Sequence, residues 1–173
     1  MSAETFVNAL FLITAVVAAG ILITAVFPII WNMAGTFSTA SHESDTRMRT
    51  DFKIVTTYAN NTGIGGGWAK IWMKNIGTSR IGVAEIKQSD IFIGIVGNFN
   101  RATLDISNWE PVIDNTWNYQ LSDDNNNGYW DSGETLEIIA VSSQFTPPPA
   151  DQSVYFQFVL PNGVWRSSEF TRI

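Results

Sequence analysis

The chain has 173 residues, a formal net charge of −6 and a sequence pI near 4.6. This acidic balance is a poor match to nucleic acid or to an anionic membrane surface, so we set nucleic-acid binding aside. The lack of cysteine excludes disulfide bonds, thiolate chemistry and cysteine-ligated zinc.

An uninterrupted apolar segment runs from Phe6 to Trp31, and no charged residue lies between Glu4 and Glu43. A helix of these roughly 26 apolar residues would be about 39 Å long, enough to cross a hydrocarbon core of about 30 Å with some tilt. The segment lacks initial basic residues and is too long for a typical cleaved signal peptide, although the small residues Ser38–Ala40 keep cleavage as an alternative. We therefore predict a transmembrane or filament-core helix.

The stretch from Asn32 to about Thr50 stays compatible with a helix but becomes polar, and we predict a stalk that continues the helix. Its Ser41, His42 and Asp45 could be parts of a hydrolase site. Their spacing is local, no nucleophile signature accompanies them, and a solvated helix face explains them better.

From Asp51 onward, short runs rich in Val, Ile, Thr and aromatic residues alternate with turn clusters, without helical patterns between them. The expected strands are Phe52–Tyr58, Trp68–Lys74, Gly82–Lys87, Ile91–Val96, Trp117–Leu121, Thr135–Val141, Val154–Leu160 and Val164–Phe170. About seven or eight such strands fit an immunoglobulin-like sandwich. We therefore predict an α+β chain, with the helix and stalk at residues 1–50 and an all-β sandwich at residues 51–173.

The Trp68–Lys74 run has two distinct faces. One face is apolar, whereas Trp68, Lys70, Trp72 and Lys74 alternate on the other. Such a face could be a subunit contact or a platform on which sugar rings stack. It could also be an ordinary surface on which one Trp lies under a loop and lysine stems cover the other.

Residues 123–134, DDNNNGYWDSGE, match the calcium-loop pattern D-x-[DN]-x-[DN]-G-x5-E at every specified position. A hard cation is bound by six to eight oxygens, supplied by a loop that folds around it. The predicted ligands are Asp123, Asn125, Asn127, the Tyr129 carbonyl, Asp131 and Glu134, with Gly128 allowing the sharp turn. A polar turn without metal is the rival explanation.

The flanks of this loop read as strands, so we predict a structural Ca²⁺ clamp grafted between strands and not an EF-hand. Its affinity should lie in the roughly 10⁻⁴–10⁻³ M range of extracellular modules, which favours an external domain. Arg47 and Arg49, the first basic residues after the apolar segment, would by themselves place the domain in the cytoplasm, but long domains translocate regardless of charge. Asn60–Thr62 is a possible glycosylation sequon.

Three stretches resemble the archaellum accessory (stator) proteins of the FlaG family, within the archaellin and type IV pilin-like superfamily. They read SAETFVNALFLITAVVAAGILITAVFPIIW, MAGTFSTASHESDTRMRTDFKIV and WMKNIGTSRIG. The archaellum is the rotating swimming filament of archaea. The resemblance implies an N-terminal membrane helix, an immunoglobulin-like domain outside the membrane, and a role with a partner protein in the static anchor of the motor.

We therefore expect a structural, non-enzymatic archaellum component in the archaeal cell envelope, with the helix in the membrane or filament core. It should form a homo-oligomer or bind membrane or filament helices, an accessory partner protein or archaellin. The acidic loop is similar to loops of some archaellins, which favours one alternative, a repeating subunit of an archaellum or type IV pilus-like filament. A membrane-tethered carbohydrate-binding module using Trp68 and Trp72 is a further alternative.

Overall fold

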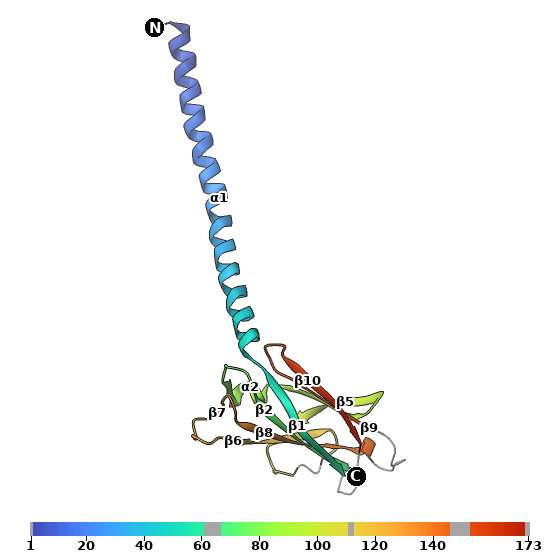
Figure 1. Cartoon of the computed structure of the whole chain (residues 1–173). Helices are drawn as coiled ribbons and strands as arrows, with labels where there is room; N and C mark the ends of the chain where they lie inside the picture. The colour runs from blue at the N-terminus through green and yellow to red at the C-terminus, as the bar shows by residue number, and fades with distance from the viewer. Residues whose placement is uncertain (1, 61–66, 111–112, 146–152, 172–173) are drawn as a thin grey trace. The chain divides into compact units, whose positions relative to one another are not determined.

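The computed structural model describes residues 2–60, 67–110, 113–145 and 153–171. The chain divides into two compact units, one ending at Ser44 and the other beginning at Asp45. Helix α1 spans Ala3–Arg49 (Figure 1), so it forms the first unit and its last residues, 45–49, belong to the second. The helix therefore continues through the polar stretch after Trp31, as the sequence predicts.

Helix α1 has 47 residues, and none of those described is buried. Its most apolar 18-residue window has a mean hydropathy of 2.7, so it is long and apolar enough to cross a membrane. Hydroxyl groups along it are satisfied within the helix: Thr14 Oγ1 donates to the Leu10 carbonyl at 2.7 Å, and Thr24 Oγ1 to the Gly20 carbonyl at 3.0 Å. Such an apolar surface requires lipid or other helices to cover it.

The second unit is a β domain. Its strands are β1 Phe52–Asn60, β2 Gly67–Asn75, β3 Ile81–Gly82, β4 Asp90–Ile95, β5 Asn98–Leu104, β6 Thr116–Ser122, β7 Tyr129–Trp130, β8 Thr135–Ser142, β9 Ser153–Val159 and β10 Trp165–Thr171. Short helices α2, Val83–Lys87, and η1, Ser143–Phe145, lie between strands. The predicted order of a long apolar helix followed by a β-sandwich domain is confirmed.

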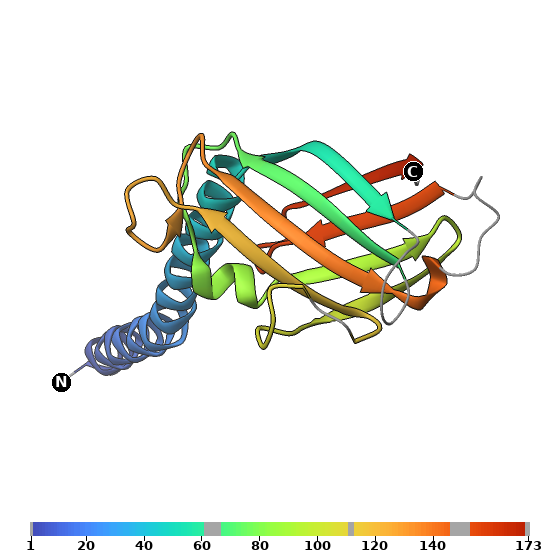
Figure 2. The same ribbon diagram turned by 90° about the horizontal axis from the view of Figure 1, so that it is seen from below.

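Eight strands form one folded sheet in the order β1-β2-β8-β6-β5-β4-β9-β10, and β3 pairs with β7 separately. Only the short β5–β6 pairing is parallel among the described ladders. The half formed by β1, β2, β8 and β6 lies over the half formed by β5, β4, β9 and β10 (Figure 2). At the free edges, Arg166 of β10 hydrogen-bonds Asp51, just before β1, and its guanidinium lies 5.9 Å from the ring centroid of Phe52.

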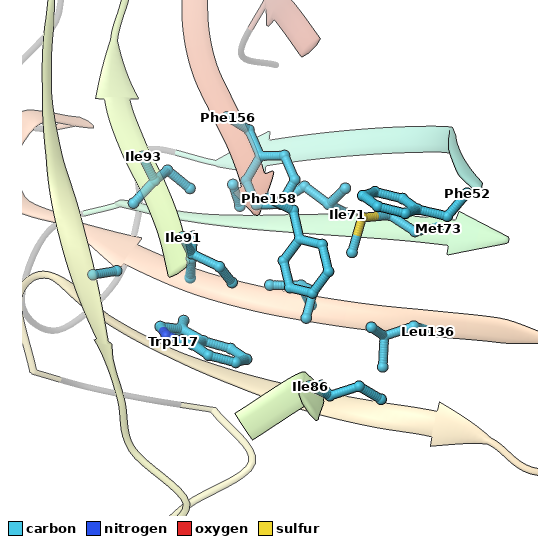
Figure 3. Packing of buried hydrophobic residues seen from close by; sticks show 14 of the residues in the cluster. Phe52, Ile71, Met73, Ile86, Ile91, Ile93, Trp117, Leu136, Phe156 and Phe158 are labelled. Atoms are coloured by element: carbon cyan, nitrogen blue, oxygen red, sulfur yellow. The ribbon is translucent and has the colours of Figure 1, made fainter. Parts of the chain in front are cut away.

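The core lies between these two halves (Figure 3). The alternating residues Val154, Phe156, Phe158 and Leu160 are all buried, as their spacing predicts. Ala69, Ile71 and Met73 of β2 are fully buried opposite them. Rings meet edge-to-face and tilted, with 5.5 Å between the centroids of Phe52 and Phe158 and 5.7 Å between those of Phe52 and Trp130.

The expected strand Gly82–Lys87 is wrong, because only Ile81–Gly82 is extended and Val83–Lys87 forms α2. The Gly82 N–H donates to Glu85 Oε2 at 2.8 Å, which caps the turn, and Ile86 is the one α2 residue buried. Strand β5 was not expected from the sequence, because its Asn98–Leu104 run exposes most of its side chains and lacks an apolar alternation.

Candidate functional site: an acidic loop and an aromatic–lysine face

The acidic loop Asp123–Glu134 connects β6 to β8 and contains β7. Its first turn is formed by Asp123, whose Oδ2 accepts from the Gly128 N–H at 2.7 Å and whose Oδ1 accepts from the Asn127 N–H at 3.1 Å. Gly128 has a φ of +76°, in the left-handed region where glycine is tolerated best. The sequence pattern therefore corresponds to a closed turn in which the first Asp binds the backbone of the glycine.

The two predicted amide ligands are held by backbone hydrogen bonds. Asn125 Oδ1 accepts from the Asn127 N–H at 3.1 Å, and Asn127 Oδ1 accepts from the Tyr129 N–H at 2.8 Å. Their Nδ2 groups both donate to Asp131 Oδ2, at 2.8 Å from Asn125 and 2.7 Å from Asn127. These bonds, led by that from Asn125 and aided by the charge of Arg80, lower the pKa of Asp131.

Glu134 closes the loop at its other end. Its side chain is largely buried, Oε1 accepts from the Asp124 N–H at 3.0 Å, and Oε2 accepts from the Asp131 N–H at 2.8 Å. The Trp130 indole N–H donates to the Glu134 carbonyl at 2.9 Å, and Trp130 itself is fully buried. The loop is therefore fixed to the domain core at the position of its last predicted ligand.

The structure brings the six predicted ligand residues into this one hydrogen-bonded loop. Carboxylate and amide oxygens are the ligands that Ca²⁺ prefers, and carboxylates retain further lone pairs beyond those that accept these hydrogen bonds. Within the described ranges, however, no three His, Cys, Asp or Glu side chains are grouped as a metal site. The donor set fits a hard cation, whereas the geometry is that of a loop closed by its own hydrogen bonds.

The sequence did not indicate that an arginine side chain, Arg80, lies beside this loop. The Arg80 guanidinium lies 4.4 Å from the ring centroid of Tyr129, and Arg80 acts electrostatically on Asp131. The approach arises because β3, which starts just after Arg80, pairs with β7, with Gly82 opposite Tyr129. No local pattern could have indicated this contact, because it depends on a two-residue pairing between distant segments.

The aromatic–lysine face is the outward face of β2 with its neighbours on β1 and β8. Tyr58 and Trp68 lie 5.3 Å apart between ring centroids. Lys70 Nζ lies 5.5 Å from the ring centroid of Trp68 and 5.7 Å from that of Trp109, and it pairs with Glu137 at 3.7 Å. Sequence reasoning missed Trp109, which the β5–β6 connection brings over Lys70.

These contacts restrict the sugar-platform interpretation. The ring of Trp68 is already in contact with Tyr58 and Lys70, whereas Trp72 has neither an aromatic nor a cation–π neighbour in the described part of the chain. Of the two indoles, Trp68 is therefore engaged by its neighbours within the domain, whereas Trp72 has no such ring or cation contact among the described residues.

The remaining predicted residues lie elsewhere. Ser41 and His42 are on the exposed surface of α1, where they form part of a polar helix face. Asn60 ends β1, but the rest of its sequon, residues 61–62, falls outside the described residues, so glycosylation stays a prediction.

Comparisons with known proteins agree on one group. The family model of archaeal-type flagellin matches residues 8–170. A protein from Archaeoglobus fulgidus, itself described only as uncharacterized, is 23% identical over 175 residues and covers 99% of each chain.

Three solved structures share the fold. The archaellum periplasmic stator protein FlaG from Sulfolobus acidocaldarius has a TM-score of 0.50 at 21% identity, covering 70% of this chain and 99% of its own. The archaeal flagellin FlaB1 from Methanocaldococcus jannaschii has a TM-score of 0.53 at 14% identity, with 71% and 90% covered. The archaeal flagellum of Methanospirillum hungatei strain JF1 has a TM-score of 0.59 at 15% identity, with 99% and 94% covered.

The expected resemblance to archaellum proteins is thus confirmed by a family match that spans both the helix and the β domain. The chain belongs to the archaeal-type flagellin family.

Proposed function

We propose that this chain is a structural, non-enzymatic component of the archaellum, anchored or bundled through α1, with a β domain that self-associates or binds an envelope partner. The observation that carries this proposal is α1 itself, a 47-residue helix with a long apolar surface and no buried residue among those described. A surface of that size is stable only in lipid or against other helices. Membership in the archaeal-type flagellin family supports a structural role over a catalytic one.

The length of the uncharged part of α1 favours a second candidate, a repeating filament subunit. Roughly 38 residues separate Glu4 from Glu43, so the uncharged helix is about 57 Å long, nearly twice a hydrocarbon core of about 30 Å. Met33 and Phe37 lie beyond the predicted apolar segment and are 68% and 76% exposed. Packing against neighbouring helices would cover these side chains, whereas a bilayer holding Phe6–Trp31 would leave them in water.

Electron microscopy of the native protein tests both candidates. A stator or anchor should stay in the membrane fraction, with the chain absent from purified filaments. A filament subunit should appear as a repeated density with the α1 helices packed together in the core. A monomer that diffuses freely after loss of residues 1–40 would contradict both.

The β domain is proposed to lie outside the membrane, at the cell surface or in the pseudoperiplasm. The support is the acidic loop, which is proposed to bind Ca²⁺ as a structural clamp through Asp123, Asn125, Asn127, the Tyr129 carbonyl, Asp131 and Glu134. A single loop of this kind, without a paired loop, is expected to have the modest affinity of extracellular modules and to fill only where calcium is abundant. Protease accessibility of the β domain on intact cells tests the orientation, because an internal domain would be protected until lysis.

A further inference from the structure

Two lysines face each other directly on the outward side of the sheet. The β1–β2 register places Lys53 opposite Lys74, and both side chains are exposed. Like charges directly opposite in antiparallel strands destabilise the pairing. Neither lysine has an ion-pair partner in the part of the chain that the structure describes, so the positive charge of this pair is uncompensated.

Trp72 lies on the same face, one step along β2 from Lys74. Its cross-strand neighbours are Thr56 and Glu137, and the Glu137 carboxylate pairs with Lys70 at 3.7 Å. We call Lys53, Trp72 and Lys74 the basic patch. It combines two unpaired cations with a half-buried indole, the combination of charge and aromatic surface that protein interfaces favour.

A complementary surface is formed by the β5–β6 connection, whose described residues are 105–110 and 113–115. It contains Asp105, Glu110 and Asp114, and no Lys or Arg. Ile106 and Ile113 are 67% and 59% exposed on it. We call this segment the acidic rim; it combines negative charge with exposed apolar side chains.

Two of the three rim carboxylates have local partners. Asp105 Oδ1 accepts from the Ser107 N–H at 2.9 Å, and Asp114 accepts from the N–H and the hydroxyl of Ser143 at 2.6 and 2.7 Å. Glu110 is exposed and takes part in no ion pair among the described residues. Glu110 is therefore the rim charge that is available to a partner.

The acidic rim and the basic patch lie on the same face of the domain, at different positions along the strands. Asn118 Nδ2 donates to the Asn108 carbonyl at 2.6 Å, and Trp109 lies over Lys70, so the rim is seated on the strands beside Lys70. Lys70 and Lys74 are four residues apart, or about 13 Å along β2. Because both surfaces point the same way, a second copy must be turned face to face with the first, and the rim of each molecule then lies against the patch of the other.

We infer that the basic patch docks onto the acidic rim of a second copy of this chain. Glu110 of one copy would pair with the Lys53–Lys74 couple of the other, while Ile106 and Ile113 would exclude water beside Trp72. Because the rim and the patch lie on one face, each copy presents both of them to the other, so the contact is isologous and closes a two-fold dimer. The inference rests on the proposed function, since it requires copies held side by side by α1.

The absence of native cysteine allows a direct test. Full-length Thr56→Cys and Asn108→Cys variants are mixed after reconstitution into lipid vesicles and treated with a short bis-maleimide. Both side chains are exposed, Thr56 opposite Trp72 and Asn108 in the rim, so Lys53, Lys74 and Glu110 stay in place. The expected result is a heterodimer yield about fivefold above either homodimer, the ratio that about 1 kcal/mol of preference gives. Raising the salt concentration should reduce the heterodimer, because exposed charge pairs are screened.

A Ser167→Cys variant supplies the matched control, because Ser167 is exposed on β10 in the other half of the domain. Pairing Thr56→Cys with Ser167→Cys should give only the collisional background. Equal yields for the Asn108 and Ser167 pairs would overturn the inference. If sedimentation then still shows oligomers, self-association stands and only this contact fails. A monomer in lipid would overturn the inference and self-association together, and would leave an anchor that binds an envelope partner.

An anionic polysaccharide is the competing occupant of the basic patch. Tryptophan fluorescence is therefore titrated with polygalacturonate, using the wild type and Lys53→Glu/Lys74→Glu. A saturable change lost in the double variant, without heterodimer formation, would assign the patch to an acidic glycan and overturn the inference. No saturable change, together with the heterodimer, supports it.

Discussion

The backbone N–H of Asp124 donates to Oε1 of Glu134 at 3.0 Å, so that one carboxylate joins the two ends of the acidic loop. The second oxygen, Oε2, accepts from the Asp131 N–H at 2.8 Å. Both oxygens therefore stabilise the loop without metal. Replacing one oxygen by an NH₂ group would direct a donor at a backbone donor.

Glu134→Gln is accordingly expected to destabilise the β domain even in the presence of a chelator. The expected loss in the free energy of unfolding is about 1–3 kcal/mol, because a part-buried backbone N–H loses its acceptor to a donor on a largely buried side chain. Chemical denaturation followed by tryptophan fluorescence measures the change. Asp124→Asn is the matched control, since only its backbone takes part in the loop hydrogen bonds. Equal stability of the two variants would contradict the clamp role of Glu134.

Calcium is expected to raise the melting temperature of the wild-type protein. At a concentration about tenfold above Kd, mass action gives roughly RT ln(11), or about 1.4 kcal/mol. The Tm is measured with calcium and with chelator, and Glu134→Gln should lose most of the difference while Asp124→Asn keeps it. A melting temperature that does not change with calcium, with chelator or with the Glu134 substitution would show that the loop is a turn that binds no metal.

Asp105 makes a pH-dependent contribution to the stability of the folded state. Hydrogen bonds from Ser107, first from its side chain and then from its backbone, hold the pKa of Asp105 below its ordinary value of 3.8. Because the pKa of Asp105 is lower in the folded than in the unfolded state, the carboxylate stabilises the fold at pH values above its unfolded-state pKa. This stabilisation is lost as the pH falls through the folded-state pKa. Ser107→Ala should therefore raise the Asp105 pKa, which carboxyl ¹³C NMR titration measures. An unchanged titration would show that the hydroxyl contributes nothing.

Gly77 is expected to be intolerant of a side chain. A Cβ there would lie 2.4 Å from the Arg49 carbonyl oxygen and 2.5 Å from the Asp51 nitrogen. Both atoms belong to the backbone, and the Gly77 N–H itself donates to the Asp51 carbonyl at 2.8 Å. Gly77→Ala should therefore destabilise the β domain by more than about 2 kcal/mol, because the backbone must move.

Gly82→Ala serves as the comparison for this substitution, since the nearest atom to its Cβ would be Glu85 Oε2 at 3.6 Å, an ordinary contact. Gly82→Ala is expected to change the free energy of unfolding by less than about 1 kcal/mol. The melting temperatures of the two variants are measured side by side by thermal unfolding. Similar melting temperatures would contradict the close backbone approach at Gly77.

The sequence alone predicted the elements whose signal is local. An uncharged apolar run specifies α1, because a helix satisfies its own backbone in any apolar surrounding. The alternation of Val154, Phe156 and Phe158 specifies a buried strand face, because successive strand side chains point to opposite sides. The acidic loop could be recognised from its spacing for the same reason: its side-chain hydrogen bonds join residues within one short segment, Asp123–Glu134.

Only the tertiary structure decided the features that depend on which strands become neighbours. The polar strand β5 forms because β4 and β6 flank it, and its own residues carry no pattern that predicts it. Lys53 lies opposite Lys74, and Trp109 over Lys70, through register and loop placement. Pairing between distant segments is set by the sum of core contacts across the whole domain, so no single window of sequence contains the information that fixes it.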